Sequence, residues 1–172
     1  MNTIVDNNCA RNKGCAICVN PDKLFISNLE DISNVSNEID SAWGLIMTKS
    51  KRYIFGTVYL KLRYNEAINA IMTMLELAKT KLKVLNASGI ILVGDLNSRH
   101  MSWGDSTNND YSKELLQKLD PTQFSVVTSK DPTFLCVGGS SYIDLMIISN
   151  NIADNFISCT SDNYVELYSG AP

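Results

Sequence analysis

Two polar side chains follow directly on a short apolar run near the middle of the chain. Residues 90–93 are Ile-Ile-Leu-Val, and Gly94-Asp95-Leu96-Asn97 comes next. Side chains beyond the carboxyl end of a strand in an α/β sheet project into an open crevice. On extended backbone, Asp95 and Asn97 point the same way and offer a carboxylate and an amide to one ligand. The pair suits a water nucleophile and a phosphate oxygen, although Asp and Asn equally form turns and helix caps.

Three further residues carry groups that could act beside this pair. Asp144 stands between Ile143 and Leu145 in an apolar stretch, where a buried carboxylate needs a partner. Tyr59 ends a strand-like run, so its hydroxyl either faces a ligand or lies in solvent. His100 is the single histidine of the chain. It acts either as a base or only as a loop residue without a catalytic role.

The segments that must position these residues are mostly strand-like. Aromatic and β-branched runs bounded by Pro, Gly, Asn and Asp turns predict short strands. The expected strands are residues 15–19, 43–47, 53–59, 90–93, 124–128, 133–136, 142–149, 155–160 and 164–167. The first fourteen residues are polar and predict a loop, and the polar turn at residues 49–52 makes the second and third strands an antiparallel pair. Residues 90–93, apolar throughout, predict a central strand buried on both faces.

Two helices are expected, at residues 65–85 and 111–119. In the first, apolar residues recur at three- and four-residue steps along one face: Ile68, Ile71, Met72, Leu75, Ala78, Leu82 and Leu85. Asn65 is a candidate cap for its start. Its lysines near the C-terminal end suit the helix dipole and predict a solvated face rather than a nucleic-acid patch. Trp43 and Trp103 are expected to be core aromatics.

Composition limits the possible functions. The chain has 172 residues and 45% apolar content, which predicts a single domain spanning residues 1–172. Charged residues make up 19% and the net charge is −3, so any role on DNA must rest on a site rather than on a basic surface. No apolar run approaches the ~20 residues that a membrane span needs, so we expect no membrane role.

The cysteines favour a reducing, intracellular setting. There are five, an odd number, and no charged and then apolar leader marks secretion. Cys15 and Cys18 have the spacing of a zinc or redox pair. Because no second pair of Cys or His completes a metal site, we expect structural thiols on a strand.

Five segments, in family order, resemble the endonuclease/exonuclease/phosphatase superfamily in the form found in LINE-type (non-LTR) retrotransposons. They are residues 12–17, 56–59, 90–104, 131–134 and 141–145. Residues 90–104 are similar to the Gly-Asp-Phe/Leu-Asn signature, including its continuation through His100 and Trp103-Gly104. The other four resemble the Gly-Gly-Val-Ala element, the strand ending in an active-site Tyr, the Pro-Thr element and the Ser-x-Ile-Asp-Leu element. The resemblance spans nearly the whole chain.

The resemblance assigns catalytic roles to four residues. Asp95 would orient or deprotonate the attacking water, and Asn97 would hold the scissile phosphate. Tyr59 would hydrogen-bond a phosphate oxygen, and Asp144 would orient a catalytic histidine. The physical chemistry agrees, because a carboxylate activates water while polar donors and a metal stabilise charge on the phosphate.

The resemblance also implies a fold and a cofactor. The fold would be an α/β (α+β) four-layer sandwich of two packed mixed β-sheets flanked by helices. The cofactor would be Mg²⁺ or Mn²⁺, which prefers oxygen ligands, with Asp95 contributing to its binding only indirectly. Asn97 and Tyr59, together with Ser98 and His100 of the signature, would line the substrate site.

Two family features lack a counterpart in this sequence. The family places an Asn and a metal-ligand Glu before the Gly-rich strand, whereas Glu30 and Glu38 follow residues 15–19, so the ligand role passes to neither. The family's closing Ser-Asp-His element is expected near residues 169–172, and residues 161–163, Ser-Asp-Asn, predict a hairpin turn instead. We therefore expect a partial domain, incomplete in its first strands and its last element, whose own catalysis is impaired.

The leading interpretation is the endonuclease domain of a retrotransposon. Its partners would be a target DNA duplex and a reverse transcriptase domain in the same polyprotein, and an active element would place it in the nucleus. One alternative is a cellular phosphodiesterase or phosphatase of the same superfamily. Another is a non-catalytic binding module that keeps the fold.

Overall fold

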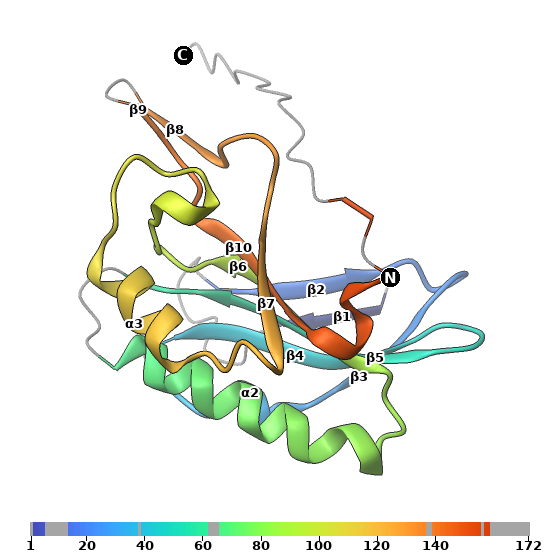
Figure 1. The fold of residues 1–172 in the computed structure, drawn as a ribbon. Helices are drawn as coiled ribbons and strands as arrows, with labels where there is room; N and C mark the ends of the chain where they lie inside the picture. Colours follow the sequence, from blue (N-terminus) through green and yellow to red (C-terminus); the bar gives the residue numbers. More distant parts are fainter. Residues whose placement is uncertain are drawn as a thin grey trace.

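A mixed six-stranded sheet forms the centre of the protein (Figure 1). The computed structural model describes residues 2–5, 14–37, 39–61, 66–136, 139–155 and 157–158. In spatial order the strands are β3 (Phe25–Asn28), β4 (Asp40–Met47), β5 (Arg52–Tyr59), β6 (Gly89–Asp95), β10 (Asp144–Ser149) and β7 (Phe124–Thr128). Only the β5–β6 pair of this sheet is parallel. Parallel neighbours need a crossover, and the long helix α2 (Ala67–Val84) lies within it.

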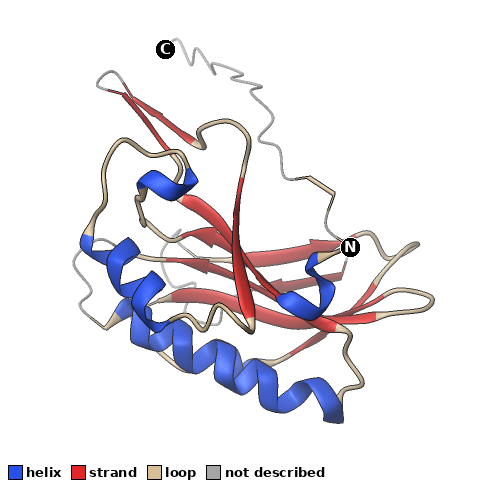
Figure 2. Cartoon of the chain, viewed as in Figure 1, coloured by secondary structure: helices blue, strands red, loops and turns tan. Residues whose placement is uncertain are grey.

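Helices cover one face of this sheet, as Figure 2 shows. Alternation along β5 directs Ile54 and Val58 into the core beneath α2. The predicted apolar face of α2 is confirmed, because Ile68, Ile71 and Leu75 are buried. The short helix α1 (Glu30–Ser33) and helix α3 (Asp110–Lys118) contribute further residues to the same core. The proposed cap Asn65 lies outside the described residues.

A second, two-stranded sheet packs on the opposite face. Strand β1 (Asn2–Val5) pairs antiparallel with β2 (Ala16–Val19). Ile17 and Val19 of β2 pack with Ala42 of β4 in a small apolar cluster. The predicted class is confirmed: a mixed α+β sandwich in which two sheets stack and helices flank them.

The cysteine spacing does not produce a metal pair. Cys15 is buried and its thiol donates to the backbone oxygen of Asp40 at 3.2 Å, whereas Cys18 is exposed. Three positions apart near a strand, the two side chains point to opposite faces. Among the described residues no group of three His, Cys, Asp or Glu side chains could hold a metal ion. In those same ranges, no helix is both long and apolar enough to cross a membrane.

Several expected elements differ from the observed ones. Residues 2–5 form a strand rather than part of a loop, because pairing with β2 overrides their weak local pattern. Asn155 follows the short helix α4 (Asn150–Ala153) in a turn, so the expected strand at residues 155–160 is wrong where it is described. The expected turn at 161–163 and strand at 164–167 lie outside the described residues.

Strand β6 is central, as predicted, but its two faces differ. Ile90 and Leu92 are fully buried beneath the helices, whereas Ile91 and Val93 are only half-buried. The expectation of burial on both faces is therefore only half right. The physical reason is that β2 packs over β4 and β5, the strands on one side of β6.

Candidate active site

Strand register places four polar residues side by side across the sheet. Asp40 of β4 is the partner of Tyr59 in β5, Tyr59 is the partner of Asp95 in β6, and Asp95 is the partner of Asp144 in β10. Directly paired residues project to the same face of a sheet. We call Asp40, Tyr59, Asp95 and Asp144 the polar row. It brings together three of the four residues expected to be catalytic, and Asp40 was not anticipated.

Asn97 joins the polar row through a turn rather than along an extended strand. Its φ of 46° is left-handed, and its backbone N–H donates to Asp95 Oδ1 at 2.9 Å. We expected Asp95 and Asn97 to lie on extended backbone and to point the same way. This is wrong, because β6 ends at Asp95 and Asn97 is not extended. The turn-forming alternative is what the structure shows.

This turn ties the end of β6 to the end of β5. Asn97 Nδ2 donates to the Leu60 carbonyl at 2.5 Å, and the Leu60 N–H donates to the Asp95 carbonyl at 2.9 Å. Asn97 is therefore held at the end of β5, next to Tyr59, whose side chain is exposed at 39%.

The environment of Asp95 favours its protonated form. Burial is the largest influence and raises the pKa of the Asp95 carboxyl, the Asn97 N–H lowers it, and the charge of Asp144 raises it again. The net direction is upward from the ordinary value. A carboxylate with a raised pKa is a stronger base than an ordinary aspartate near neutral pH.

A hydrogen bond to its backbone N–H holds Asp144 in place, and its side chain is exposed to solvent. Its N–H donates to Thr133 Oγ1 at 3.1 Å, and Thr133 in turn donates its N–H to the Ser141 carbonyl at 3.0 Å. The expectation of a buried carboxylate between Ile143 and Leu145 is wrong, because alternation sends those two inward and Asp144 outward. Asp144 therefore needs no buried partner.

Two residues expected to line the substrate make contacts within the loop. Ser98 is fully buried, and its hydroxyl donates to the Leu96 carbonyl at 3.1 Å. His100 caps the short 3₁₀ turn η1 (Met101–Trp103) by accepting from the Ser102 N–H at 3.1 Å, and its ring lies 5.0 Å from that of Trp103. Burial rules out a substrate contact for the Ser98 side chain, whereas a substrate contact of the partly exposed His100 stays a prediction.

Two residues that sequence inspection missed hold this loop. Asn109 caps α3: its Oδ1 accepts from Ser112 and Arg99 N–H groups, and its Nδ2 donates to the Asn97 carbonyl at 2.6 Å. Asp105 is buried, and its Oδ2 accepts from the Tyr142 N–H at 3.2 Å. The available signal for Asn109 was its place before a helix, where Asn is a favoured cap.

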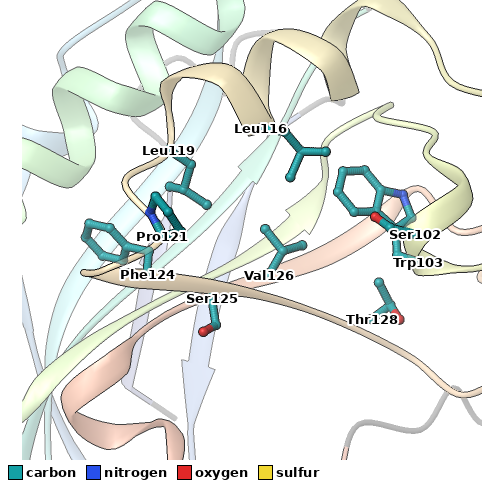
Figure 3. Close-up of a pocket in the computed structure, with 9 residues that line it drawn as sticks. All are labelled: Ser102, Trp103, Leu116, Leu119, Pro121, Phe124, Ser125, Val126 and Thr128. Atoms are coloured by element: carbon teal, nitrogen blue, oxygen red, sulfur yellow. The ribbon is translucent and has the colours of Figure 1, made fainter.

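A pocket of about 400 Å³ lies beside the site rather than in it. Figure 3 shows Trp103 at one end, with Leu116 of α3 and Leu119 just after this helix over Phe124 and Val126 of β7. Trp103 and Trp43 are buried, as expected of core aromatics. None of the residues lining this pocket belongs to the polar row, so it is not where the candidate chemistry would occur.

The polar row fits a divalent cation in part. Asp95 and Asp144 are paired carboxylates, and the repulsion that raises the Asp95 pKa is one that a cation would relieve. Mg²⁺ is commonly bound by one or two carboxylates together with waters and substrate phosphate oxygens. These two residues supply that minimum, although the described residues contain no set of three ligands.

A mixed sheet flanked by helices, with carboxylates paired at its strand ends, defines the class as an α+β protein with the endonuclease/exonuclease/phosphatase fold. The chain belongs to the endonuclease-reverse transcriptase family, whose model matches residues 53–169. No curated protein matches the sequence.

Solved structures share the fold at low sequence identity. The endonuclease domain of TRAS1, a telomere-specific non-LTR retrotransposon, matches with a TM-score of 0.62 and 17% identity over 81% of this chain and 61% of that one. An endonuclease/exonuclease/phosphatase family protein from Bacteroides thetaiotaomicron gives 0.57 and 16%, over 86% and 59%. A mannosyl-6-phosphatase from the same organism gives 0.56 and 14%, over 87% and 62%. The chain thus spans about three fifths of the length of these structures.

Proposed function

We propose that this chain is part of a divalent-metal-dependent phosphodiesterase that nicks DNA. The observation that carries the proposal is the register that aligns Tyr59, Asp95 and Asp144 on three neighbouring strands. Family membership supports a nuclease over other hydrolases, since the matching family is described as endonuclease-reverse transcriptase.

In this proposal Asp95 acts on the attacking water. Its Oδ1 accepts from the Asn97 N–H, and its Oδ2 has no hydrogen-bond partner among the described residues. Oδ2 takes a proton from water as the water oxygen attacks phosphorus and the bond to the leaving oxygen breaks; the leaving oxygen departs with the bonding electrons and takes a proton from solvent. The raised pKa of Asp95 favours this transfer.

Asn97 and Tyr59 hold the phosphate. One N–H of the Asn97 amide donates to the Leu60 carbonyl, which fixes the amide plane. The amide's second N–H and the exposed Tyr59 hydroxyl donate to non-bridging phosphate oxygens, where negative charge grows in the transition state. The resemblance implies that Asp144 orients a histidine; His100, the single histidine of the chain, caps a local turn, so we do not assign that role to it.

Mg²⁺ or Mn²⁺ would be held beside Asp144, with substrate and water oxygens as further ligands and with Asp95 contributing only through a bound water. The cation would supply Lewis-acid stabilisation of charge on the phosphate.

The substrate and partners follow from the family and remain part of the proposal. We propose a DNA duplex as substrate, a reverse transcriptase domain in the same polyprotein and, for an active element, a nuclear site of action. The mannosyl-6-phosphatase matches this chain with a TM-score of 0.56, nearly the 0.57 of the endonuclease/exonuclease/phosphatase family protein. A small phosphoester is therefore the competing substrate.

The test is a nicking assay on supercoiled plasmid with and without Mg²⁺. Two proteins are compared, the 172-residue chain and a version extended at both ends, each with an Asp95→Ala variant. We expect the extended protein to nick and its Asp95→Ala variant to lose at least about a hundredfold in rate. Equal nicking by the extended protein and its variant would refute the proposal. Asp95-dependent nicking by the 172-residue chain at the same rate as the extended protein would refute the expected impairment.

A further inference from the structure

Asp40, the unanticipated member of the polar row, holds a lysine beside Tyr59. Lys61 Nζ lies 2.9 Å from Asp40 Oδ1, and the Asp40 side chain is 6% exposed whereas that of Lys61 is 42% exposed. Asp40 Oδ2 is buried without a hydrogen-bond partner among the described residues. A buried carboxylate with a single cationic partner holds that partner firmly, because losing it would leave an uncompensated charge.

The backbone of Lys61 is fixed as well. The Tyr111 hydroxyl of α3 donates to the Lys61 carbonyl at 3.4 Å, and the preceding Leu60 is tied to Asp95 and Asn97. Lys61 is therefore anchored at both its carbonyl and its ammonium. Such an anchored, half-exposed cation is suited to bind an anion with little loss of side-chain entropy.

We propose that Lys61 binds a phosphate of a polynucleotide other than the one that is cleaved, with Asp40 as its positioning residue. This inference rests on the proposed function and narrows its substrate class to a polymer. Asp40 lies two strands from Asp95, about 10 Å at the usual strand spacing. Because Lys61 Nζ is held at Asp40, on the far side of Tyr59 from Asp95 in the row, the phosphate that it contacts is one next to the phosphate attacked beside Asp95. Phosphates of one DNA strand recur every ~3.4 Å along the duplex axis, so a neighbouring phosphate falls within that span.

The charge balance of the row agrees with this assignment. Asp95 and Asp144 are both acidic, and the whole chain carries a net charge of −3. A polyanionic substrate approaching these carboxylates is repelled unless a nearby cation offsets them. Lys61, whose charge is shared with Asp40, is the exposed cationic group at the Tyr59 end of the row, so a phosphate there meets an ammonium rather than a third carboxylate.

The experiment compares a substrate with many phosphates and a substrate with one. Lys61→Gln, Lys61→Arg and the charge-neutral pair Asp40→Asn/Lys61→Gln are made in whichever protein nicks in an Asp95-dependent way. The matched control is Lys81→Gln. It removes the 2.6 Å ion pair between Lys81 of α2 and Asp31 of α1, away from the row. Substrates are supercoiled plasmid and bis(p-nitrophenyl) phosphate.

We expect Lys61→Gln to lower kcat/KM on plasmid by roughly tenfold, the effect of one charge-assisted contact, and to change the small substrate by less than about twofold. Lys61→Arg should keep most of the plasmid activity, and Lys81→Gln all of it. The charge-neutral pair guards against misfolding and should show the same selective loss as Lys61→Gln. Equal losses on both substrates, or no loss on plasmid, would overturn the inference.

A binding measurement separates this inference from the proposed function. Fluorescence anisotropy of a labelled DNA duplex is followed across salt concentrations with Asp95→Ala as the background, so that no cleavage occurs. Adding Lys61→Gln should reduce the slope of log affinity against log salt by about 0.9, one phosphate contact, whereas adding Lys81→Gln should not. An unchanged slope overturns the inference even if nicking is observed. A reduced slope without any Asp95-dependent nicking supports the phosphate contact and refutes the proposed nuclease.

Discussion

Asp95 and Asp144 are direct partners in the antiparallel register of β6 and β10. Two carboxylates thus share one face at one end of the sheet, and the charge of Asp144 is among the causes of the raised Asp95 pKa. Their pairing links the protonation of the proposed base to a neighbour that is distant in sequence.

Asp144→Asn should lower the pKa of Asp95, because it removes a negative charge while keeping the backbone bond to Thr133. An NMR titration of the Asp95 carboxyl carbon measures the change directly. The acid limb of the pH–rate profile should move to lower pH in parallel. Asp154→Asn, an exposed aspartate beyond the other end of β10, is the control and should leave the titration unchanged. A rise in the Asp95 pKa in Asp144→Asn would contradict this account.

Asp95→Asn should stabilise the fold at neutral pH. Since the folded pKa of Asp95 exceeds the ordinary 3.8, its contribution to stability is full below that value and is lost as pH rises through the folded pKa. Asn cannot ionise and keeps an oxygen for the Asn97 N–H. Thermal unfolding should therefore give a higher Tm for the variant at pH 7, with the difference narrowing toward pH 3.5. A variant that is less stable than the parent at pH 7 would show that the charge is favourable after all.

Gly94→Ala should disrupt the contact between β5 and β6. Gly94 has a φ of +150°, and a Cβ there would lie 1.9 Å from the Val58 carbonyl oxygen. Gly139→Ala is the matched control, because Gly139 has a φ of +149° with nothing within 4 Å of a Cβ. We expect the control to cost about 1–2 kcal/mol through backbone strain alone and Gly94→Ala at least about 2 kcal/mol more. Urea unfolding measures both, and equal costs would show that the strands separate easily.

Asn109→Ala should destabilise the protein and reduce activity together. It removes the cap of α3 and the bond to the Asn97 carbonyl, for a loss of about 1–3 kcal/mol in the free energy of unfolding. Asn109→Asp keeps the capping oxygen but replaces the donor to Asn97 with a carboxylate oxygen, which repels the Asn97 carbonyl. We expect this second variant to retain most of the stability while kcat falls, as measured by urea unfolding and the nicking rate. If both variants keep full activity, Asn97 does not depend on α3 for its position.

Local sequence patterns were sufficient for the main elements. The three- and four-residue spacing of Ile68, Ile71 and Leu75 predicted the buried face of α2, and the apolar run at 90–93 predicted the strand that ends at Asp95. The antiparallel pairing of β4 and β5 also followed from two strands with a short turn between them. These features depend on periodicity within one segment, which is visible in the sequence.

The roles of individual site residues were less accessible. Ser98 shares the signature segment with Asp95, yet its hydroxyl is buried against the Leu96 carbonyl, and Asn97 takes a left-handed turn in place of extended backbone. Asp40 and Lys61 carry no motif, and their importance arises from a buried ion pair. Burial and turn conformation depend on what packs around a residue, so spacing could not predict them.

The sequence by itself indicated helix α2, the strands β4, β5 and β6, and the chemical groups that stand at their ends. Only the tertiary structure decided that Tyr59, Asp95 and Asp144 lie in one row with Asp40. Strand register is set by packing between segments far apart in the chain, and a shift of one residue would turn each side chain to the opposite face of the sheet.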